Sequence, residues 1–383
     1  MIYLSALPAL AASAYWLLAL VAVIRRWFEP EPRAAVLPPI SVLKPIHGRD
    51  PDLYRAIRSH VVQDYPEYEV LFGFNDPNDA GIQDVLRLIS EFPDRSLRLI
   101  EAPNQAPNGK VGVLARLATE ARYPLLLVND SDITVASDYL RRVVAHLEDP
   151  RTGVVTCLYR ARSQHLPGKF EALGIATDFA PGVLVSRLIG VARFALGSTM
   201  LFRAGDLRRI GGFDAIARHI ADDYELGRRI SELGYQVALS RTVVETALQG
   251  RSWGQVWRHQ VRWARTIRCS QPAGYVGVIV THATLWAMLA WVAGAWPVAM
   301  AAFGIRMLAG LAVGVGVLHD AQVALLAPLI PLRDLWGFAV WAAGLLGDTV
   351  EWRGQRLRLS RDGRITPVEL RTIRRRIRPP FLG

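Results

Sequence analysis

Two long stretches of the chain contain no charged residue. The first is Ile2–Ile24, with 23 positions, and the second is Tyr275–Gly304, with 30 positions. A helix needs about 20 apolar residues to cross a bilayer, so both stretches are long enough. The alternative for the first is a cleaved signal peptide, but its start lacks basic residues and it exceeds the usual apolar core of about 7–15 residues. We therefore expect a retained membrane anchor at residues 1–24.

Between these stretches, short apolar runs of strand length alternate with segments of helical periodicity. The predicted strands are Ile40–Leu43, Val70–Phe74, Leu97–Ile100, Leu125–Val128 and Val154–Leu158. The predicted helices are Leu53–Val62, Ile82–Phe92, Val111–Ala121 and Tyr139–Leu147. Largely apolar strands that alternate with helices are typical of a mainly parallel sheet covered on both faces. The predicted fold class is therefore α/β, with residues 36–250 as its soluble domain.

The region after the soluble domain is apolar but interrupted. Residues 275–350 include the second charge-free stretch and then Met307–Leu332, in which His319 and Asp320 break the apolar pattern. Polar groups at membrane depth usually face protein or a cavity, so this pair is expected to pack between spans or near a lipid substrate. Leu335–Gly347 is short for a crossing and is expected to be re-entrant or interfacial.

Residues 251–270 join the soluble domain to this region. Apolar residues recur at near-helical spacing from Trp253 to Ile267, and arginines fill much of the remainder. A basic amphipathic helix that carries tryptophan is typical of the membrane interface. We expect an interfacial helix here.

The net charge of +11 is concentrated beside the apolar segments. Residues 351–383 contain ten arginines against three acidic residues, and Arg25, Arg26 and Arg33 follow the first apolar stretch. Basic residues next to membrane spans favour the cytoplasmic side, so the soluble domain and a basic tail at 351–383 are predicted to be cytoplasmic. A nucleic-acid partner is not expected, because it would leave the apolar segments unexplained.

Carboxylates follow three of the predicted elements. Asp76 comes directly after the second strand, and a further helix opens at the acidic run Ala221–Glu225. The fourth strand leads into Asp130 and Asp132. Ligands of parallel sheets bind beyond the carboxyl ends of the strands. We expect the ligand at these positions.

The spacing of Asp130 and Asp132 suits a metal site. An Asp-x-Asp pair at a strand end can hold a hard divalent cation, Mg²⁺ or Mn²⁺, and through it a diphosphate. The alternative is that both are ordinary turn or helix-capping residues. Delivery of the pair to the sheet edge by a buried-type strand favours the metal site. Cys157 and Cys269 match no metal-binding spacing.

Basic residues also lie where phosphate could bind. The chain has three lysines, Lys44, Lys110 and Lys169. Lys44 directly follows the first strand, and Lys110 follows an Asn-Gly pair that by itself predicts only a turn. Arg262, followed by Trp263, precedes the second apolar stretch, where an arginine can clamp a leaving diphosphate.

Five short motifs stand in order along the chain. They are Lys44-Pro45, Asn75-Asp76-Pro77, Asp130-Ser131-Asp132, Ala221-Asp222-Asp223-Tyr224 and Arg262-Trp263. This order resembles that of ceramide glucosyltransferases and related processive-synthase-like enzymes with a GT-A fold, and the resemblance extends to Trp352-Arg353-Gly354. The segments most similar to bacterial hopanoid-biosynthesis glycosyltransferases are Thr156–Arg160, Phe179–Pro181 and Arg262–Arg268. The resemblance implies a multi-pass protein of a bacterial inner membrane.

The resemblance implies a donor site at the sheet edge. The donor-binding residues would be Lys44, Pro45, Asp76, Lys110, Asp130, Arg262 and Trp263. Asp130 and Asp132 would bind the divalent metal that holds the diphosphate of the sugar nucleotide.

The resemblance also implies where the acceptor is activated. Asp223 would be the general base, with Asp222 beside it on the acceptor side. The family motif Gln/Arg-x-x-Arg-Trp has His259 at its first position here, so the acceptor-side role of His259 is left open. The turn-rich segment Gly197–Met200, together with Gly211–Phe213, either packs tightly below the site or makes room for the acceptor.

These features together predict an inverting glycosyltransferase that moves one sugar from a UDP-sugar to the hydroxyl of a membrane lipid. UDP-N-acetylglucosamine with a hopanoid polyol and UDP-glucose with ceramide are both compatible with the motifs. One alternative is a processive polysaccharide synthase, which shares the motifs but usually has more spans to form a channel. Another is a membrane scaffold that only binds nucleotide, which would have no need of Asp223.

Overall fold

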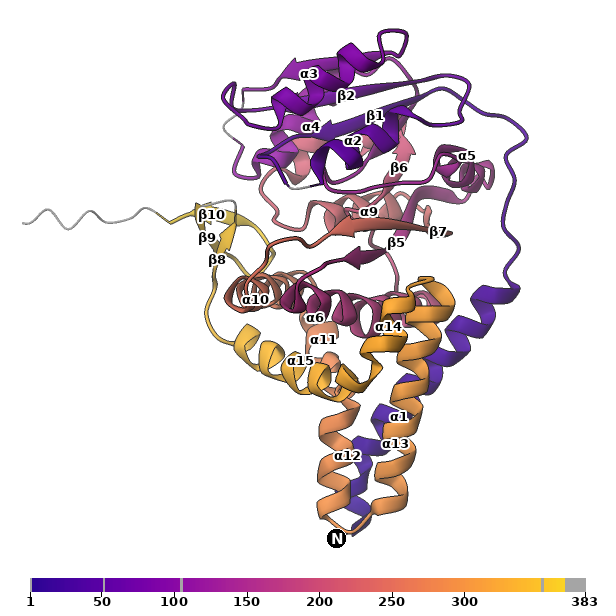
Figure 1. Cartoon of the computed structure of the whole chain (residues 1–383), viewed down its shortest axis with the longest axis vertical. Coiled ribbons are helices and arrows are strands. Elements are labelled where there is room, and N and C mark those ends of the chain that lie inside the picture. Colours follow the sequence, from indigo (N-terminus) through magenta and orange to yellow (C-terminus); the bar gives the residue numbers. More distant parts are fainter. Residues whose placement is uncertain (1, 51, 104–105, 353–354, 369–383) are drawn as a thin grey trace, which may run out of the picture.

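The computed structural model describes residues 2–50, 52–103, 106–352 and 355–368, with side chains from residue 6 onward. Figure 1 shows three tiers along the long axis of the molecule: a sheet domain, a layer of helices beneath it, and a narrow helical bundle. The bundle combines the N-terminal helix with helices from the last third of the chain. Segments that are far apart in the sequence, the N-terminal helix and helices from the last third of the chain, therefore form the same tier, the bundle.

A seven-stranded sheet in the order β3-β2-β1-β4-β6-β5-β7 forms the core of the first tier. Its strands are β1 (Ile40–Pro45), β2 (Tyr68–Phe74), β3 (Leu97–Glu101), β4 (Leu125–Val128), β5 (Thr152–Arg162), β6 (Met200–Arg203) and β7 (Gln236–Ala247). Neighbouring strands are parallel except at β6, which runs antiparallel to both β4 and β5. All strands but β6 therefore end at the same edge, and the predicted mainly parallel α/β fold is confirmed.

The five strands predicted from apolar runs are all present, and two further strands were missed. β6 has only four residues and directly follows the turn-like Gly197–Thr199. β7 is long, but its burial alternates and it carries Gln236, Arg241 and Glu245. Neither strand shows the continuous apolar run that marks a strand buried on both faces.

Helices cover both faces of the sheet, as the sequence predicted. One face packs against α2 (Leu53–Val61), α3 (Ile82–Glu91) and α5 (Tyr139–Val144). The other face packs against α4 (Gly109–Glu120), α8 (Ala204–Arg209) and α9 (Asp222–Glu232). Helix α4 begins where the side chain of Asn108 accepts a hydrogen bond from the backbone N–H of Val111, an N-cap that fixes the start of the helix beside the sheet edge.

The bundle consists of α1 (Ile2–Phe28), α12 (Ala283–Val292) and α13 (Trp296–Leu311). The charge-free stretch Tyr275–Gly304 is therefore a helical hairpin rather than a single span, with a turn at Gly294 (φ 85°). Its helices meet α1 through buried alanines: Ala6, Ala9, Ala287, Ala290, Ala299 and Ala302. Small residues allow helix backbones to approach closely, which favours association of membrane helices.

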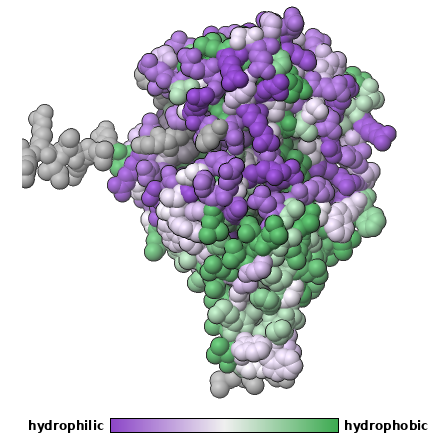
Figure 2. Space-filling view, viewed as in Figure 1, coloured by the Kyte–Doolittle hydropathy of each residue, from purple (hydrophilic) through white to green (hydrophobic). Residues whose placement is uncertain are grey.

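Three described helices are long and apolar enough to cross a membrane: Ala6–Phe28, Trp296–Val317 and Ala321–Leu345. The bent pair Pro272–Thr281 and Ala283–Val292 qualifies as a fourth if it forms one span. Figure 2 shows hydrophobic residues over the bundle and its upper end, and hydrophilic residues over the sheet domain. The apolar surface thus coincides with the helices that qualify.

The middle tier joins the sheet to the bundle. It contains α6 (Leu166–Gly174), a π-helical turn (Ile175–Phe179), α7 (Ala180–Leu188), α10 (Trp253–Ser270), α11 (Pro272–Gly277), α14 (Ala321–Leu326) and α15 (Ile330–Leu345). The apolar segment Met307–Leu332 is not continuous, because a turn at His319 (φ 53°) separates α13 from α14. Asp320 caps α14 by accepting from the N–H of Gln322. Helix α15 lies across the direction of the bundle helices in Figure 1, as an interfacial helix would.

Part of the predicted basic tail is folded. Strands β8 (Thr349–Trp352), β9 (Gln355–Leu359) and β10 (Ile365–Pro367) form a small antiparallel sheet. This sheet docks on the loop before α9, where the N–H of Ile365 donates to the carbonyl of Arg218 at 2.7 Å. Residues 369–383, which hold five of the arginines, lie outside the described residues.

Candidate active site

Strands β1 and β4 place Lys44, Pro45, Asp130 and Asp132 at the shared edge of the sheet. Lys44 is fully buried, and its Nζ donates to the backbone carbonyl of Asp130 at 2.7 Å. Burial lowers the pKa of Lys44 to about 7, against the opposing charges of Asp132 and Asp130. Pro45 is buried at the end of β1. In this structure Lys44 therefore anchors the loop that carries Asp130 through a hydrogen bond to its backbone.

Lys110 links two of the predicted motifs. Its Nζ lies 2.8 Å from Oδ1 of Asp130 and 2.8 Å from Oδ2 of Asp222. Burial opposes its charge, but the carboxylates of Asp130, Asp222 and Asp223 outweigh that effect and raise the pKa of Lys110. Lys110 is therefore a charged ammonium group at the centre of three carboxylates.

Asp223 is held close to this cluster by the backbone. Its Oδ2 accepts a hydrogen bond from the N–H of Gly197 at 2.9 Å, and its Oδ1 accepts from the N–H of Tyr224 at 2.8 Å. The carbonyl of Gly197 in turn accepts from the N–H of Asp130 at 3.1 Å. A Cβ at Gly197 would lie 2.7 Å from Oδ2 of Asp130. Gly197 therefore acts as a tight spacer between two carboxylates, which supports the packing interpretation of Gly197–Met200.

Asp132 points to a different neighbour. Its Oδ2 accepts from the hydroxyl of Thr246 on β7 at 2.5 Å. Burial, and after it the charge of Asp130, raise the pKa of Asp132. The two members of the Asp-x-Asp pair thus contact opposite sides of the sheet edge, with Asp130 toward α4 and α9 and Asp132 toward β7.

The residues around this pair can bind a divalent metal ion whose remaining coordination positions are filled by substrate phosphates and water. Within the described residues, no three acidic, histidine or cysteine side chains are grouped to hold a metal by themselves. Mg²⁺ is commonly held by one or two carboxylates together with substrate phosphates and water. Asp130 and Asp132 supply oxygen ligands of the right kind, and the Asp130 side chain is 43% exposed and therefore accessible.

Asp76 stays apart from the carboxylate cluster. It follows β2 and is exposed, and its Oδ1 accepts from the N–H of Asn78 at 2.9 Å. This local turn is the ordinary use of an aspartate after a strand. The structure places Asp76 at the predicted sheet edge without joining it to Asp130.

Helix α10 places Arg262, Trp263 and His259 beneath the sheet edge. His259 packs on Trp263 with ring centroids 4.7 Å apart. Its Nδ1 lies 2.5 Å from Oε1 of Glu171, a buried carboxylate that also accepts from Arg251 at 2.9 Å. Burial lowers the pKa of His259 despite this carboxylate. The same Nδ1 also lies 2.9 Å from a guanidinium nitrogen of Arg251, so His259, Glu171 and Arg251 form one cluster.

Aromatic side chains connect this helix to the carboxylate cluster. Phe179 lies 5.9 Å from Trp263 and 5.5 Å from Tyr159, measured between ring centroids. Burial, followed by the charges of Asp223, Asp130 and Asp132, raises the pKa of Tyr159. Tyr159 therefore lies within the electrostatic reach of the proposed base and of the Asp-x-Asp pair.

Three residues of this site were missed from the sequence: Tyr159, Glu171 and Thr246. Tyr159 had been noted only within a motif, and Glu171 and Thr246 lie in segments without motif spacing. Tyr159 directly follows the predicted strand Val154–Leu158, and ligands bind beyond the carboxyl ends of such strands, which was a signal for this residue. Thr246 lies on β7, which was not predicted.

Comparisons with known proteins identify the family of the chain. The sequence profile of glycosyl transferase family 21 matches residues 2–365. Ceramide glucosyltransferase 1 of Caenorhabditis elegans is 28% identical over 215 residues, which cover 55% of this chain and 45% of the worm protein. A probable glycosyltransferase of Bacillus subtilis, YdaM, is 25% identical over 251 residues, covering 60% of this chain and 55% of its own length. The chain thus spans about half the length of these curated relatives.

A solved structure shares the fold. It is the mannosyltransferase PcManGT from Pyrobaculum calidifontis in complex with GDP-Man and Mn²⁺, with a TM-score of 0.55 and 20% identity, covering 89% of this chain and 99% of that one. The predicted GT-A fold and the resemblance to ceramide glucosyltransferases are thereby confirmed. Because the family profile covers nearly the whole described chain, this protein belongs to glycosyl transferase family 21.

Proposed function

We propose that the protein is an inverting glycosyltransferase that transfers one sugar from a UDP-sugar to the hydroxyl of a membrane lipid. The observation that carries this proposal is the placement of Asp223. Its half-buried carboxylate is fixed by the N–H of Gly197 beside the Lys110–Asp130–Asp222 cluster, at the sheet edge that ligands of such sheets occupy. The helices that bear the apolar surface lie directly below this domain.

In the proposed mechanism, Asp223 removes the proton from the acceptor hydroxyl as the hydroxyl oxygen attacks the anomeric carbon of the sugar. The leaving diphosphate departs on the opposite side, and Arg262 and Lys110 offset its growing negative charge. Asp130 and Asp132 would hold the divalent metal, which when bound supplies further positive charge to the diphosphate. The Mn²⁺ complex of the structural neighbour is compatible with such a metal.

The Asp-x-Asp role predicts a specific binding defect. We expect Asp132→Ala to weaken donor binding in the presence of Mn²⁺ or Mg²⁺ by about tenfold or more, because one of two metal-binding carboxylates is lost. Without metal, the affinity for the donor should change little. Isothermal titration of UDP-sugar with and without metal checks this, and equal metal dependence in the variant and the wild type would count against the role.

The environment of Asp223 predicts an acidic limb in the pH profile. Burial and then the adjacent Asp222 carboxylate raise the pKa of Asp223 to about 6. A base acts only when deprotonated, so kcat/KM should fall about tenfold per pH unit below this pKa and level off above it. Asp222→Asn removes a raising charge and should shift the limb to lower pH. A limb at the same pH in that variant would contradict the assignment.

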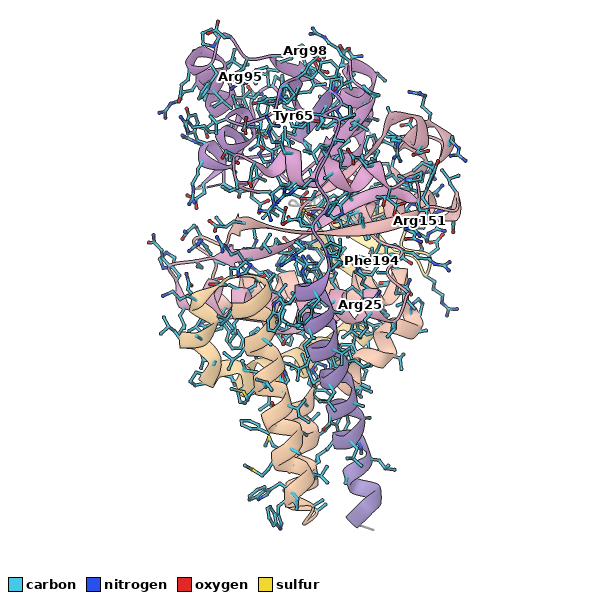
Figure 3. All side chains as sticks on the ribbon, turned by 90° about the vertical axis from the view of Figure 1, so that its right-hand side faces the viewer. Arg25, Tyr65, Arg95, Arg98, Arg151 and Phe194 are labelled. Atoms are coloured by element: carbon cyan, nitrogen blue, oxygen red, sulfur yellow. The ribbon has the colours of Figure 1, made fainter. Side chains whose placement is uncertain are left out.

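The orientation in the membrane is part of this proposal. We place crossings at α1, at the bent pair Pro272–Thr281 and Ala283–Val292, and at α13, with α10 and α15 at the interface, so that the catalytic domain and the basic C-terminal segment lie on the same side. Figure 3 shows Arg25 at the end of α1 that meets the sheet domain. Arginines at this end favour a cytoplasmic catalytic domain, and a bacterial inner membrane is the setting that the motifs imply.

The acceptor and the sugar are proposed as classes. The relatives include ceramide glucosyltransferases, and the two proposed pairs are ceramide with UDP-glucose and a hopanoid polyol with UDP-N-acetylglucosamine. The decisive experiment incubates purified protein with a panel of UDP-sugars and each lipid class, with product masses determined. One sugar per lipid supports the proposal, whereas a polymer supports a processive synthase. Donor binding without any transfer would support a scaffold.

A further inference from the structure

We propose that a polar cavity beside Asp132 binds a neutral polyhydroxyl group, either the hexose of the donor or the polyol head of the lipid acceptor. This inference rests on the proposed function and adds a binding site to it. The cavity has a volume of about 300 Å³, at the lower end of the range for ligand sites.

The cavity lies at the ligand-binding edge of the sheet. Its walls come from the segments after β1, β4, β5 and β7 and from the first turn of α14. Thr246 lines the cavity and donates its hydroxyl to Asp132. A group bound there would therefore be separated from Asp132 of the Asp-x-Asp pair by the side chain of Thr246.

The charge of the lining favours an uncharged ligand. Two acidic residues, Asp52 and Glu245, face two basic ones, Arg55 and Arg162, so the formal charges cancel. Both arginines also pair with Glu245, at 3.4 Å and 2.5 Å. Phosphate recognition uses unpaired arginine or lysine, and none of the described lining residues offers one.

The lining instead offers groups suited to hydroxyls. Among the described lining residues, Ala247 is the only apolar one. The side chains of Asp52, Gln164, Gln249 and Gln322 reach the cavity from four separate segments and form no hydrogen bond to other described residues. The three glutamine amides both donate and accept, and the Asp52 carboxylate accepts, so these four side chains together can satisfy the paired donor and acceptor roles of several hydroxyl groups.

The two sources of such a group approach from different sides. Asp132 and Thr246 lie toward the predicted diphosphate, where the hexose of the donor would extend. Gln322 follows the turn after α13, and Arg160 fixes that turn by donating to the carbonyl of His319 at 2.9 Å. A lipid head rising from the membrane surface would meet this wall.

The test uses full-length protein in lipid nanodiscs, without sugar-headed detergent. The variant Gln164→Leu/Gln249→Leu removes two amides, and Ala247→Leu fills space without removing a polar group. Gln83→Leu, on the exposed surface of α3, is the matched control. The probes are free D-glucose and myo-inositol by saturation-transfer NMR, UDP and UDP-glucose by titration calorimetry, and the acceptor KM in the transfer assay.

Both cavity variants are expected to weaken binding of the free polyols at least tenfold while the affinity for UDP stays within twofold. If the gap in affinity between UDP-glucose and UDP shrinks tenfold, the cavity binds the donor hexose. If that gap persists and the acceptor KM rises tenfold, it binds the lipid head. The inference would be overturned if the affinity for free polyols, the difference in affinity between UDP-glucose and UDP, and the acceptor KM all stayed within twofold of the wild type. Absence of transfer by the wild type would overturn the proposed function, and the free-polyol measurement would still decide the cavity.

Discussion

Replacing Asp223 with asparagine is expected to lower the kcat of sugar transfer by about 10²–10⁴-fold, the usual contribution of a positioned general base. The asparagine amide keeps the size of the side chain, and its oxygen can still accept from the N–H of Gly197. It has no basicity to remove the acceptor proton. The fold and donor binding should therefore persist while turnover is lost.

The matched control for this variant is Asp214→Asn, which changes an exposed carboxylate shortly before the same helix. Its kcat should stay within twofold of the wild type. Donor affinity is measured by calorimetry and turnover by product mass for both variants. Turnover near that of the wild type in Asp223→Asn would assign the base to another residue, with Asp222 the nearest candidate.

The second large effect concerns an ion cluster between the membrane helices and the middle tier. Arg306 of α13 is fully buried and donates to Asp334 of α15 at 2.6 Å and to Asp178 at 2.8 Å. Arg333 pairs with Asp178 at 3.0 Å. The guanidinium of Arg306 also lies 4.0 Å from the ring centroid of Trp16 on α1. One arginine thus connects three helices that are distant in sequence.

Arg306→Met is expected to lower the free energy of unfolding by about 3–5 kcal/mol, because it leaves the buried carboxylate of Asp334 without its partner. Asp334 would retain its hydrogen bond from Thr284 but lose its countercharge. The measurement is chemical unfolding of the purified protein in detergent micelles. Loss of folded protein on expression would be the extreme form of the same result.

Two variants separate charge imbalance from other causes. The double variant Arg306→Met/Asp334→Leu removes both charges, and it should recover most of the lost stability, because apolar replacements of a buried pair are often neutral. Arg116→Met breaks an exposed pair with Glu120 and should cost less than about 1 kcal/mol. If the double variant is as unstable as the single one, unpaired charge is not the cause.

The sequence predicted the parts of the fold that depend on local pattern. The strand Leu125–Val128 was predicted with its observed ends, because a continuous apolar run lies between Pro124 and the polar pair Asn129-Asp130. The strand β7 was missed because its alternating polar residues serve contacts that arise only in the folded protein. Thr246 with Asp132 is one such contact, and Glu245 with Arg160 and Arg162 is another.

The membrane topology was likewise predicted only in part from the sequence. Apolar length marked Tyr275–Gly304 as membrane-associated, but a pattern of hydropathy does not show where a charge-free stretch turns back on itself. The predicted polar interruption at His319 and Asp320 is a turn between helices. The charges buried near the membrane, Arg306, Arg333 and Asp334, match no motif, and their pairing across helices does not follow from a local pattern.

By itself, the sequence determined the α/β class, the two apolar stretches at residues 2–24 and 275–304, and the location of carboxylates at strand ends. These features follow from periodicity and from the geometry of parallel sheets. Only the tertiary structure decided which side chains meet. It placed Lys110 between Asp130 and Asp222, hydrogen-bonded Asp223 to Gly197, and joined His259 to Glu171. These contacts span 20 to more than 100 positions of the chain, so their partners are set by the packing of whole elements, which no local pattern encodes.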